Sequence, residues 1–324
     1  MIIDCQCHYL STPYLQALDG RSGYPTLEQL NGTPYLVTAP GLGFPITGTM
    51  TDIETKLRMM DANGIDVGLL SVNVPGTCRF EAELGIRLAR QENDALAKVV
   101  TARPDRFLAL AELPLQDVDQ AILELDRSIN ELGFKGVSLF SNINGRPLDD
   151  PAFLPFYDRV RELRVPLFLH PTYPLGGEHM QDYELIQVIG FLMDTSLAMC
   201  RLIFSGILEG YPEITFVLPH LGSVLPYVMG RIDTSSGNIQ GSRANIREAP
   251  SHYFRNVYVD TVSLHPPALK LAHEFQGVDK ILFATDYPFW SVERAIQSIE
   301  KLDIPNEDKE KIFHKNAERL LQLT

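Results

Sequence analysis

The sequence predicts an α/β fold in which eight parallel strands close into a somewhat distorted (β/α)8, or TIM, barrel. Short apolar runs rich in β-branched residues alternate along the chain with segments of helical period, and the runs number eight. The expected strands cover residues 2–5, 67–72, 107–113, 136–139, 167–170, 215–218, 257–260 and 281–285. A chain of 324 residues suits one such barrel with insertions, so we expect a single domain over residues 1–324.

Several segments between these runs carry helix start and stop signals. Thr51 and Glu54 match a capping box, and Gly64 stands where a left-handed helix end is expected. Asp117 begins a second helix with the same pattern of a capping residue followed by apolar positions. Asp150 precedes a proline, which is well tolerated in the first helical turn, and so begins a third.

The stretch from residue 20 to residue 50 interrupts this alternation. It is dense in Gly, Pro and Thr, with short apolar pieces, and is too long for an ordinary connection. An insertion after a barrel strand is typical of a lid or a small β subdomain over the active face, and a surface loop is the alternative. We expect an insertion or lid within the barrel domain.

Composition and charge exclude several classes of partner. The formal net charge is −13, which disfavours nucleic acid and anionic membrane surfaces as partners. The four cysteines and the start of the chain, which lacks a basic region and a cleavage site, indicate a cytoplasmic protein without a disulfide framework. The longest apolar stretch, residues 197–208, is shorter than a membrane span and predicts a buried helix.

Polar residues gather where the expected strands end. His8 follows the first strand, His170 ends the fifth, His220 follows the sixth, Asp260 ends the seventh and Asp286 follows the eighth. The carboxyl ends of parallel barrel strands meet at one rim, where the active sites of such barrels lie. Histidine and aspartate are metal ligands and proton carriers, so their joint position predicts a metal or acid–base site.

Strand alternation orients the first of these motifs, Cys5-Gln6-Cys7-His8. Residues two apart on a strand share a face, so Gln6 should point into the barrel mouth with His8. Cys5 and Cys7 should then point toward the helices and act as core residues. The chain therefore presents Gln6-x-His8 where many metal hydrolases have His-x-His.

These motifs together resemble the amidohydrolase superfamily, and most closely its branch of aminocarboxymuconate-semialdehyde and hydroxybenzoate-type decarboxylases. The resemblance covers nearly the whole chain. The residues that carry it are His8, Phe168-Leu169-His170-Pro171, Leu218-Pro219-His220-Leu221-Gly222, Gly230-Arg231-Ile232-Asp233, Ala284-Thr285-Asp286-Tyr287-Pro288-Phe289 and Lys315-Asn316-Ala317 with Leu320-Leu321.

The resemblance implies one divalent metal ion, zinc or manganese, at the mouth of the barrel. Its protein ligands would be Gln6, His8, His170 and Asp286, with His220 beside the metal as a catalytic base or acid. Gln6 departs from the His or Glu usual in this family, and a neutral amide oxygen is a weaker donor than imidazole or carboxylate. We therefore expect the metal to bind with lowered affinity. It should keep more of its positive charge, because Asp286 would be the only anionic ligand.

The activity implied by the resemblance is non-oxidative decarboxylation of a small unsaturated or hydroxylated aromatic carboxylate. The metal would anchor the substrate, and Asp286 or His220 would deliver a proton to the ring carbon before the carbon–carbon bond breaks. The same groups would serve hydrolysis of a lactone or amide, and the motifs do not separate the two reactions. A non-catalytic barrel that binds a small carboxylate is a third alternative.

Basic and aromatic side chains complete the expected substrate site. Arg231 matches an arginine that in the family reaches a neighbouring subunit's site, which implies a homodimer; an ion pair with Asp233 is the other interpretation. Lys56 and Arg58 are weaker candidates for a carboxylate contact. The aromatic residues expected to wall the site are Phe289, Trp290, Tyr173 and Phe191.

Overall fold

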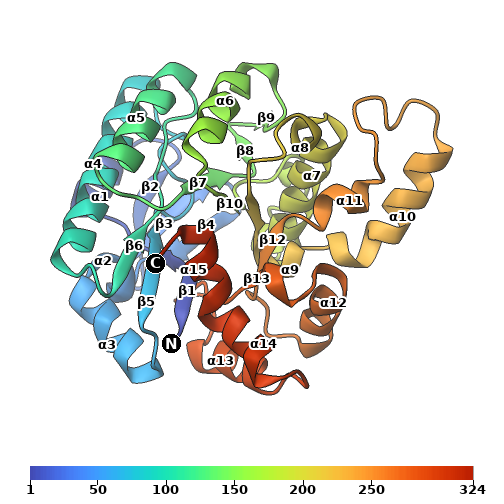
Figure 1. The fold of residues 1–324 in the computed structure, drawn as a ribbon. Helices are drawn as coiled ribbons and strands as arrows, with labels where there is room; N and C mark the ends of the chain where they lie inside the picture. The colour runs from blue at the N-terminus through green and yellow to red at the C-terminus, as the bar shows by residue number, and fades with distance from the viewer. Residues whose placement is uncertain (324) are drawn as a thin grey trace.

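The computed structural model describes residues 1–323, and its centre is a ring of eight parallel strands surrounded by helices (Figure 1). In chain order the strands are β1 (Ile3–His8), β5 (Val67–Ser71), β6 (Phe107–Ala109), β7 (Val137–Phe140), β10 (Leu167–His170), β11 (Phe216–Leu218), β12 (Tyr258–Asp260) and β13 (Ile281–Leu282). Each pairs in parallel with its neighbour along the chain, in one sheet of three strands and another of five.

Short bridges join the two sheets at both seams and complete the TIM barrel. At the first seam Ala111, just after β6, pairs in parallel with Val137 of β7. At the second, Cys7 pairs in parallel with Tyr287, and the amide of Cys5 donates to the carbonyl oxygen of Phe283 over 2.9 Å. The predicted fold class is therefore confirmed.

The helices lie outside the strands, as the sequence pattern predicts. They are α1 (Thr12–Leu18), α2 (Gly48–Thr51), α3 (Ile53–Asn63), α4 (Ala82–Ala102), α5 (Val118–Asn130), α6 (Leu154–Leu163), α7 (Phe191–Phe204), α8 (Ile207–Gly210), α9 (Pro219–Gly222), α10 (Leu225–Asn238), α11 (Pro250–Phe254), α12 (Pro266–Gln276), α13 (Val292–Glu300), α14 (Asn306–Glu310) and α15 (Asn316–Leu321). Short 3-10 turns cover Pro151–Phe153, Gly177–His179 and Val278–Lys280, and π-helical turns cover Ile186–Gly190 and Lys311–Lys315. The helix α10 projects beyond the others at the side of the barrel (Figure 1).

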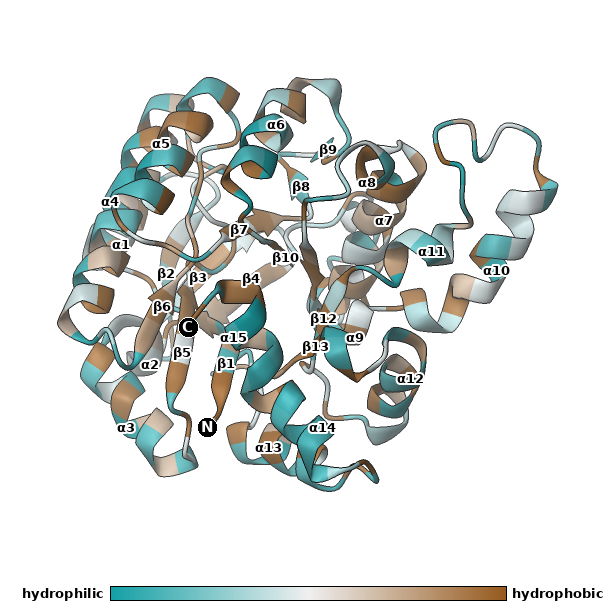
Figure 2. Cartoon of the chain, viewed as in Figure 1, coloured by the Kyte–Doolittle hydropathy of each residue, from teal (hydrophilic) through white to brown (hydrophobic). Residues whose placement is uncertain are grey.

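The barrel strands are strongly apolar, whereas hydrophilic residues cover much of the outer helical surface (Figure 2). One buried cluster fills the barrel interior and takes residues from most of the strands, including Leu69, Leu110 and Phe168. Ala317 and Leu321 of α15 belong to this cluster, so the last helix closes one end of the barrel. The other end, where the strands terminate, is left for the site.

Residues 20–50 form a small antiparallel sheet of β2 (Thr26–Leu30), β3 (Thr33–Ala39) and β4 (Leu42–Pro45). This sheet packs on the segment that follows β10. Ala39 and Leu42 form a buried cluster with Ile186, and the amide of Gln187 donates to the carbonyl oxygen of Gly43 over 3.0 Å. A further hairpin, β8 (Asn142–Ile143) with β9 (Arg146–Pro147), follows β7.

Helix boundaries differ from the sequence prediction in one place. Asp52, rather than Thr51, caps α3, because its carboxylate accepts from the amide of Thr55 over 3.0 Å. Thr51 instead ends the short helix α2. The caps expected at Asp117 and Asp150 are present, and Gly64 ends α3 with φ 69°.

The alternation predicted for β1 is wrong at Cys5. The strand register shifts between Asp4 and Cys7, and Cys5 belongs to the interior cluster while Cys7 lies on the helix side against Lys56. A bulge adds a residue to one strand of a pair and so resets which side chains share a face. Both cysteines are buried core residues, as expected.

One helical run among the described residues, Ile186–Phe204, is long and apolar enough to span a membrane by length and composition. Half of its most apolar part is buried inside the fold, and core helices of globular proteins pass the same test. The run begins with the π-helical turn and continues as α7, so the buried helix predicted for residues 197–208 starts much earlier.

Candidate metal centre and active site

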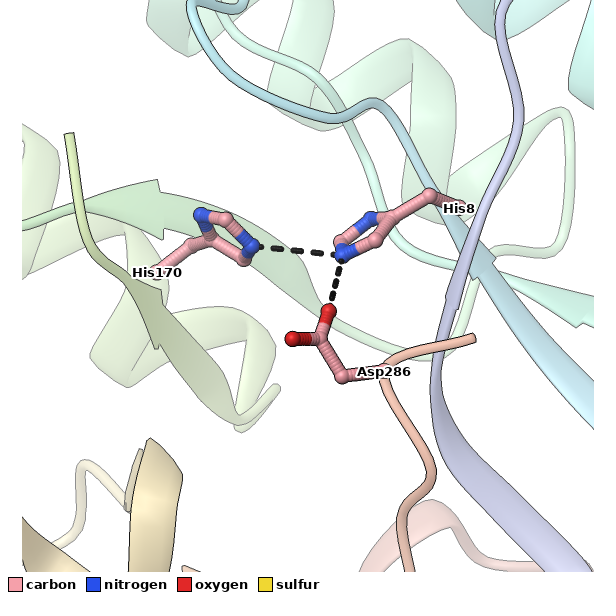
Figure 3. Close-up of side chains that lie close together, drawn as sticks. All are labelled: His8, His170 and Asp286. Atoms are coloured by element: carbon pink, nitrogen blue, oxygen red, sulfur yellow. Dashed lines mark hydrogen bonds and ion pairs between the residues drawn. The ribbon is translucent and has the colours of Figure 1, made fainter. Parts of the chain in front are cut away.

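Three predicted ligands meet at the carboxyl end of the barrel. His8 ends β1, His170 ends β10, and Asp286 lies four residues beyond β13. The Nε2 atom of His8 is 3.0 Å from Oδ1 of Asp286 and 3.2 Å from Nε2 of His170 (Figure 3). All three side chains are buried, and one ligand atom from each lies within 4.8 Å of the others. The geometry is that of a site for a single cation.

The far nitrogen of each ring is already engaged, which orients the rings. Nδ1 of His170 donates to the carbonyl oxygen of Pro171 over 2.8 Å, so its Nε2 is the atom with a free lone pair. Nδ1 of His8 lies 3.1 Å from the hydroxyl of Ser71. Metal-bound histidines are held in this way by partners on the second ring nitrogen. The two facing imidazole nitrogens and the carboxylate therefore fit a divalent metal ion.

Electrostatics of the cluster also suit a cation. Burial, with the nearby His8, lowers the pKa of His170 to about 3, so its ring is neutral and free to coordinate. Burial opposes ionisation of Asp286, but the hydrogen bond from His8 and the charges of the surrounding histidines outweigh it and lower the pKa of the carboxyl. The site thus presents a neutral imidazole at His170 and an ionised carboxylate at Asp286.

Gln6 reaches this cluster, but through its amide nitrogen. Nε2 of Gln6 donates to Oδ1 of Asp286 over 3.1 Å, the same oxygen that faces His8. In this orientation Gln6 positions the carboxylate ligand. Rotation of the amide would turn the oxygen of Gln6 toward the metal position, so its place among the ligands stays a prediction.

His220 stands beside the cluster in a constrained backbone conformation. Its φ is 58°, and Leu221 and Ser223 are also left-handed, an arrangement that costs about 1–3 kcal/mol for each non-glycine residue. The carboxylate of Asp260 accepts from the amide of His220 over 2.8 Å and from that of Val262 over 3.0 Å. Asp260 therefore fixes the backbone of His220.

The ring of His220 is available for chemistry. Its Nδ1 atom is buried and has no hydrogen-bond partner among the described residues. Burial lowers the pKa of the imidazole, with an opposing effect from Asp286 and a further lowering from His8. A neutral imidazole beside a metal cluster has the properties of a general base.

A cavity of about 720 Å³, which we call the site cavity, opens from this cluster. His170, His220 and Asp286 line one end of it. Of the predicted aromatic wall, Phe289, Trp290 and Phe191 line the cavity, and Tyr173 does not. Tyr173 packs instead near the buried residues of the insertion, where its hydroxyl accepts from the amide of Gln181 over 3.0 Å.

The insertion contributes directly to the site cavity through Leu42 and Phe44. The ring of Phe44 lies edge-on to Phe289, with 5.4 Å between centroids, and Phe289 in turn lies 6.5 Å from the ring of His8. Edge-to-face pairs at such distances are favourable. The insertion is thereby linked to the metal cluster through a chain of aromatic contacts.

The structure places two predicted substrate contacts away from the site cavity. Lys56 is fully buried, and its Nζ lies 3.3 Å from Sγ of Cys7, on the opposite face of β1 from His8. Arg231 is exposed on α10, pairs with no acid among the described residues, and does not line the cavity of its own chain. The ion pair with Asp233 considered from the sequence is absent there: residues two apart on α10 do not face each other, and the Asp233 carboxylate accepts from the amide of Ser251 over 3.0 Å.

Two polar residues that the sequence did not indicate also line the site cavity. Nδ2 of Asn73 and Oε1 of Gln187 are buried atoms without a hydrogen-bond partner among residues 1–323. Asn73 lies two residues beyond the end of β5, as His220 lies two residues beyond the end of β11. That offset was the available signal, whereas nothing in the sequence marks Gln187.

Comparisons with known proteins agree with this geometry. The chain matches the amidohydrolase family over residues 3–323. It is 36% identical to the gamma-resorcylate decarboxylase of Rhizobium radiobacter over 83% of this chain and 87% of that protein. Two solved structures superpose closely on it.

The first is 5-carboxyvanillate decarboxylase from Sphingomonas paucimobilis, with a TM-score of 0.89, 28% identity and coverage of 100% of this chain and 99% of the other. The second is a dihydroxybenzoic acid decarboxylase from Polaromonas sp. JS666, which holds manganese and the inhibitor 2-nitroresorcinol, with a TM-score of 0.83, 27% identity and coverage of 99% and 97%. The fold, the residues at the strand ends and the family match lead to one conclusion: the chain is a member of the amidohydrolase family.

Proposed function

We propose that the protein is a metal-dependent, non-oxidative decarboxylase of a small hydroxylated aromatic carboxylate. The observation that carries the proposal is the buried cluster of His8, His170 and Asp286 at the closed end of a cavity large enough for an aromatic ring. Relatives that share 36% identity, and solved structures that superpose over the whole chain, are carboxy-lyases for such acids. They do not favour hydrolysis of a lactone or amide, the alternative left open by the motifs.

His8, His170 and Asp286 would hold one divalent metal ion, with Gln6 as a fourth contact if its amide rotates. When bound, the metal supplies a positive charge that attracts the substrate carboxylate and a neighbouring ring oxygen. Manganese is supported by the Polaromonas relative, and zinc is the other ion that suits two imidazoles and a carboxylate.

Two side chains at this site can donate the proton that replaces the carboxyl group on the ring. His220 and Asp286 face the same end of the cavity, and each has a pKa below its ordinary value before substrate arrives. A substrate carboxylate brings negative charge next to both groups and favours their protonated forms. Either group can then deliver the proton to the ring carbon, and His220 is the one that is free of hydrogen bonds at Nδ1.

Phe289, Phe44 and Trp290 provide the apolar wall on which a planar ring would stack. Because Phe44 comes from residues 20–50, we assign this insertion the role of a wall or lid within one barrel domain over residues 1–324. Tyr173 and Lys56 are not supported as direct contacts by their positions behind the lining residues.

We infer a cytoplasmic homodimer from the sequence, with Arg231 as its most testable element. The guanidinium of Arg231 projects from α10, outside its own cavity, so it would meet a substrate only across an interface. Sedimentation of the wild type and of Arg231→Glu would test this. A dimer that the variant converts to monomers supports the inference, and a monomeric wild type rejects it.

The central experiment is an assay of hydroxybenzoates in which carbon dioxide release and ring absorbance are followed together, with manganese or zinc added. Release of one carbon dioxide for each ring converted, lost on chelation, supports the decarboxylase. Turnover without carbon dioxide would replace it with the hydrolase. Purified protein that takes up no metal and converts nothing would support the non-catalytic barrel.

A further inference from the structure

The charge of the site cavity is confined to one end. Among the residues that line it, those that can carry a charge near neutral pH are His170, His220 and Asp286, and none is a lysine or arginine. Burying a carboxylate away from water without a cationic or hydrogen-bonding partner is strongly unfavourable. The lining of this cavity therefore offers one place for a carboxylate, at the metal cluster, and no cationic partner for a second.

The remainder of the cavity is apolar and larger than a single ring requires. An apolar cavity of about 150 Å³ is enough to admit benzene, whereas the site cavity measures about 720 Å³. Its outer wall comes from three separate helical runs: Val188 and Leu192 from the continuous π-helical turn and α7, Tyr227 from α10, and Leu271 from α12. A substituent on the ring would extend into this part.

The outer wall is also uncovered. In the single chain Tyr227 is 82% exposed, Val188 65% and Leu271 37%, so a large apolar surface beside the ring position is uncovered. Burying apolar surface is favourable by about 0.8 kcal/mol for each methylene. A substrate with an apolar substituent would gain binding free energy by covering this wall, whereas an unsubstituted hydroxybenzoate would not cover it.

Two of the neutral polar residues that line the cavity, Asn73 and Gln187, have atoms without hydrogen-bond partners among residues 1–323. Nδ2 of Asn73, on a residue that is 1% exposed, is a buried donor, and Oε1 of Gln187 is a buried acceptor; both lack partners within residues 1–323. A neutral ring hydroxyl would satisfy either atom once its side chain turned toward the cavity, since a hydroxyl both donates and accepts. A second carboxylate can accept from Asn73 but is repelled by the acceptor of Gln187.

We propose that the preferred substrate is a hydroxylated aromatic acid with a single carboxyl group and an apolar substituent, such as an alkyl chain of several carbons. The substituent lies against Val188, Leu192 and Leu271. This inference rests on the proposed decarboxylase function and narrows it. It also separates the chain from its structural neighbour, whose substrate, 5-carboxyvanillate, carries two carboxyl groups.

The first test is a series of 2,4-dihydroxybenzoates with hydrogen, methyl, propyl or pentyl at position 6, assayed by carbon dioxide release with the manganese-loaded protein. We expect kcat/KM to rise about fourfold for each methylene until the cavity is filled. A dicarboxylic analogue should be at least tenfold poorer than the matching monoacid. A flat or falling series, or equal use of the diacid, overturns the inference and leaves the decarboxylase proposal intact.

Two matched variants test whether the effect of the substituent on kcat/KM comes from contact with the outer wall. Val188→Asp places a charge on the outer wall, and Met193→Asp places the same charge on the same helical run at a position that is 47% exposed but does not line the cavity. The ratio of pentyl to unsubstituted kcat/KM should fall at least tenfold in Val188→Asp and stay unchanged in Met193→Asp. Equal ratios in both variants would contradict the assigned wall.

A binding measurement tests the apolar wall even if none of these acids is decarboxylated. The corresponding resorcinols, which are the expected products, can be titrated against the fluorescence of Trp290, the only tryptophan in the chain and a lining residue. Tighter binding with each added carbon supports the apolar wall whatever the reaction is. Diacid use that disappears in Arg231→Ala or Arg294→Ala would show that an arginine outside the lining serves the site, and would overturn the single-carboxylate proposal.

Discussion

Two pairs of buried carboxyl groups lie near the carboxyl ends of the barrel strands, and they have different partners. On the side of β6, Glu112 accepts from the amide and hydroxyl of Thr77 over 2.6 and 2.8 Å, and Glu92 accepts from the amide of Ser11 over 3.2 Å. On the opposite side, Asp260 accepts from the amide of His220, and Asp286 faces His8.

The comparison shows that burial alone does not define a functional carboxylate. Burial raises the pKa of Glu112 to about 8 and those of Glu92 and Asp260 to about 7, despite their hydrogen bonds. Asp286 is equally enclosed, yet neighbouring histidines lower its pKa. Glu92 and Glu112 hold loops to the barrel and stay outside the site cavity, whereas Asp286 keeps a charge ready for a metal.

Removing the charge of Asp286 should have the largest effect. We expect Asp286→Asn to lose stoichiometric metal and to lower kcat/KM by about 10³-fold or more, because it removes the single anionic ligand of the cluster. Metal content by elemental analysis and carbon dioxide release measure the two effects. Glu112→Gln is the matched control. A similar loss of metal in that variant would show that a buried carboxyl group on the β6 side also affects metal binding, contrary to the comparison.

Replacing His220 should separate chemistry from metal binding. His220→Asn is expected to keep one metal per chain while activity falls about 10²- to 10⁴-fold, the usual range for a lost acid–base group. The same elemental analysis and assay apply. Loss of the metal together with activity would make His220 a ligand, and retention of activity would remove it from the proposed mechanism.

Replacing Gln6, the predicted ligand with the weakest donor atom, should have a smaller effect, on metal affinity. In Gln6→Glu a second carboxylate would face the metal position, so manganese affinity should rise about tenfold. In the metal-free variant the new charge repels Asp286, which lies 3.1 Å from the present amide, and Tm should fall. Titration with manganese, followed by Tm, reports both effects. Unchanged affinity would mean that residue 6 only positions Asp286.

Much of this arrangement could be predicted from the sequence, for a definite physical reason. Parallel strands buried on both faces appear as apolar runs, and their ends share one rim, so the order of residues alone is enough to group His8, His170, His220 and Asp286. The shift in β1 could not be predicted, because a bulge leaves no mark in composition and moved Cys5 into the interior.

Residues outside the strands were harder to predict for another reason. Lys56 occupies a helix, where lysine is usually solvated, but the packing of α3 on β1 buries it beside Cys7. Tyr173 follows a rim histidine, yet the segment after β10 turns it toward the insertion. In both cases tertiary packing, which residue type and spacing do not report, decides the contact.

The smallest expected effect concerns stability on the β6 side. Glu112 has an ordinary pKa near 4.5 when exposed and about 8 in the fold, so between these values the folded state holds a proton that the unfolded state has released. Its contribution is therefore fully present below about pH 4.5 and is lost as pH rises toward 8. Glu112→Gln removes this linkage and keeps an oxygen for Thr77.

Urea unfolding of the metal-saturated protein at pH 6.5 and pH 8 would measure this. We expect the wild type to lose about 1–2 kcal/mol more than Glu112→Gln between the two pH values, with decarboxylation at a fixed pH unaffected by the substitution. Glu131→Gln, at an exposed position just after α5, is the control and should follow the wild type. If the free energy of unfolding changed equally with pH in all three proteins, Glu112 would be ionised in the fold. Glu112 on the β6 side would then be charged, as Asp286 is on the other side.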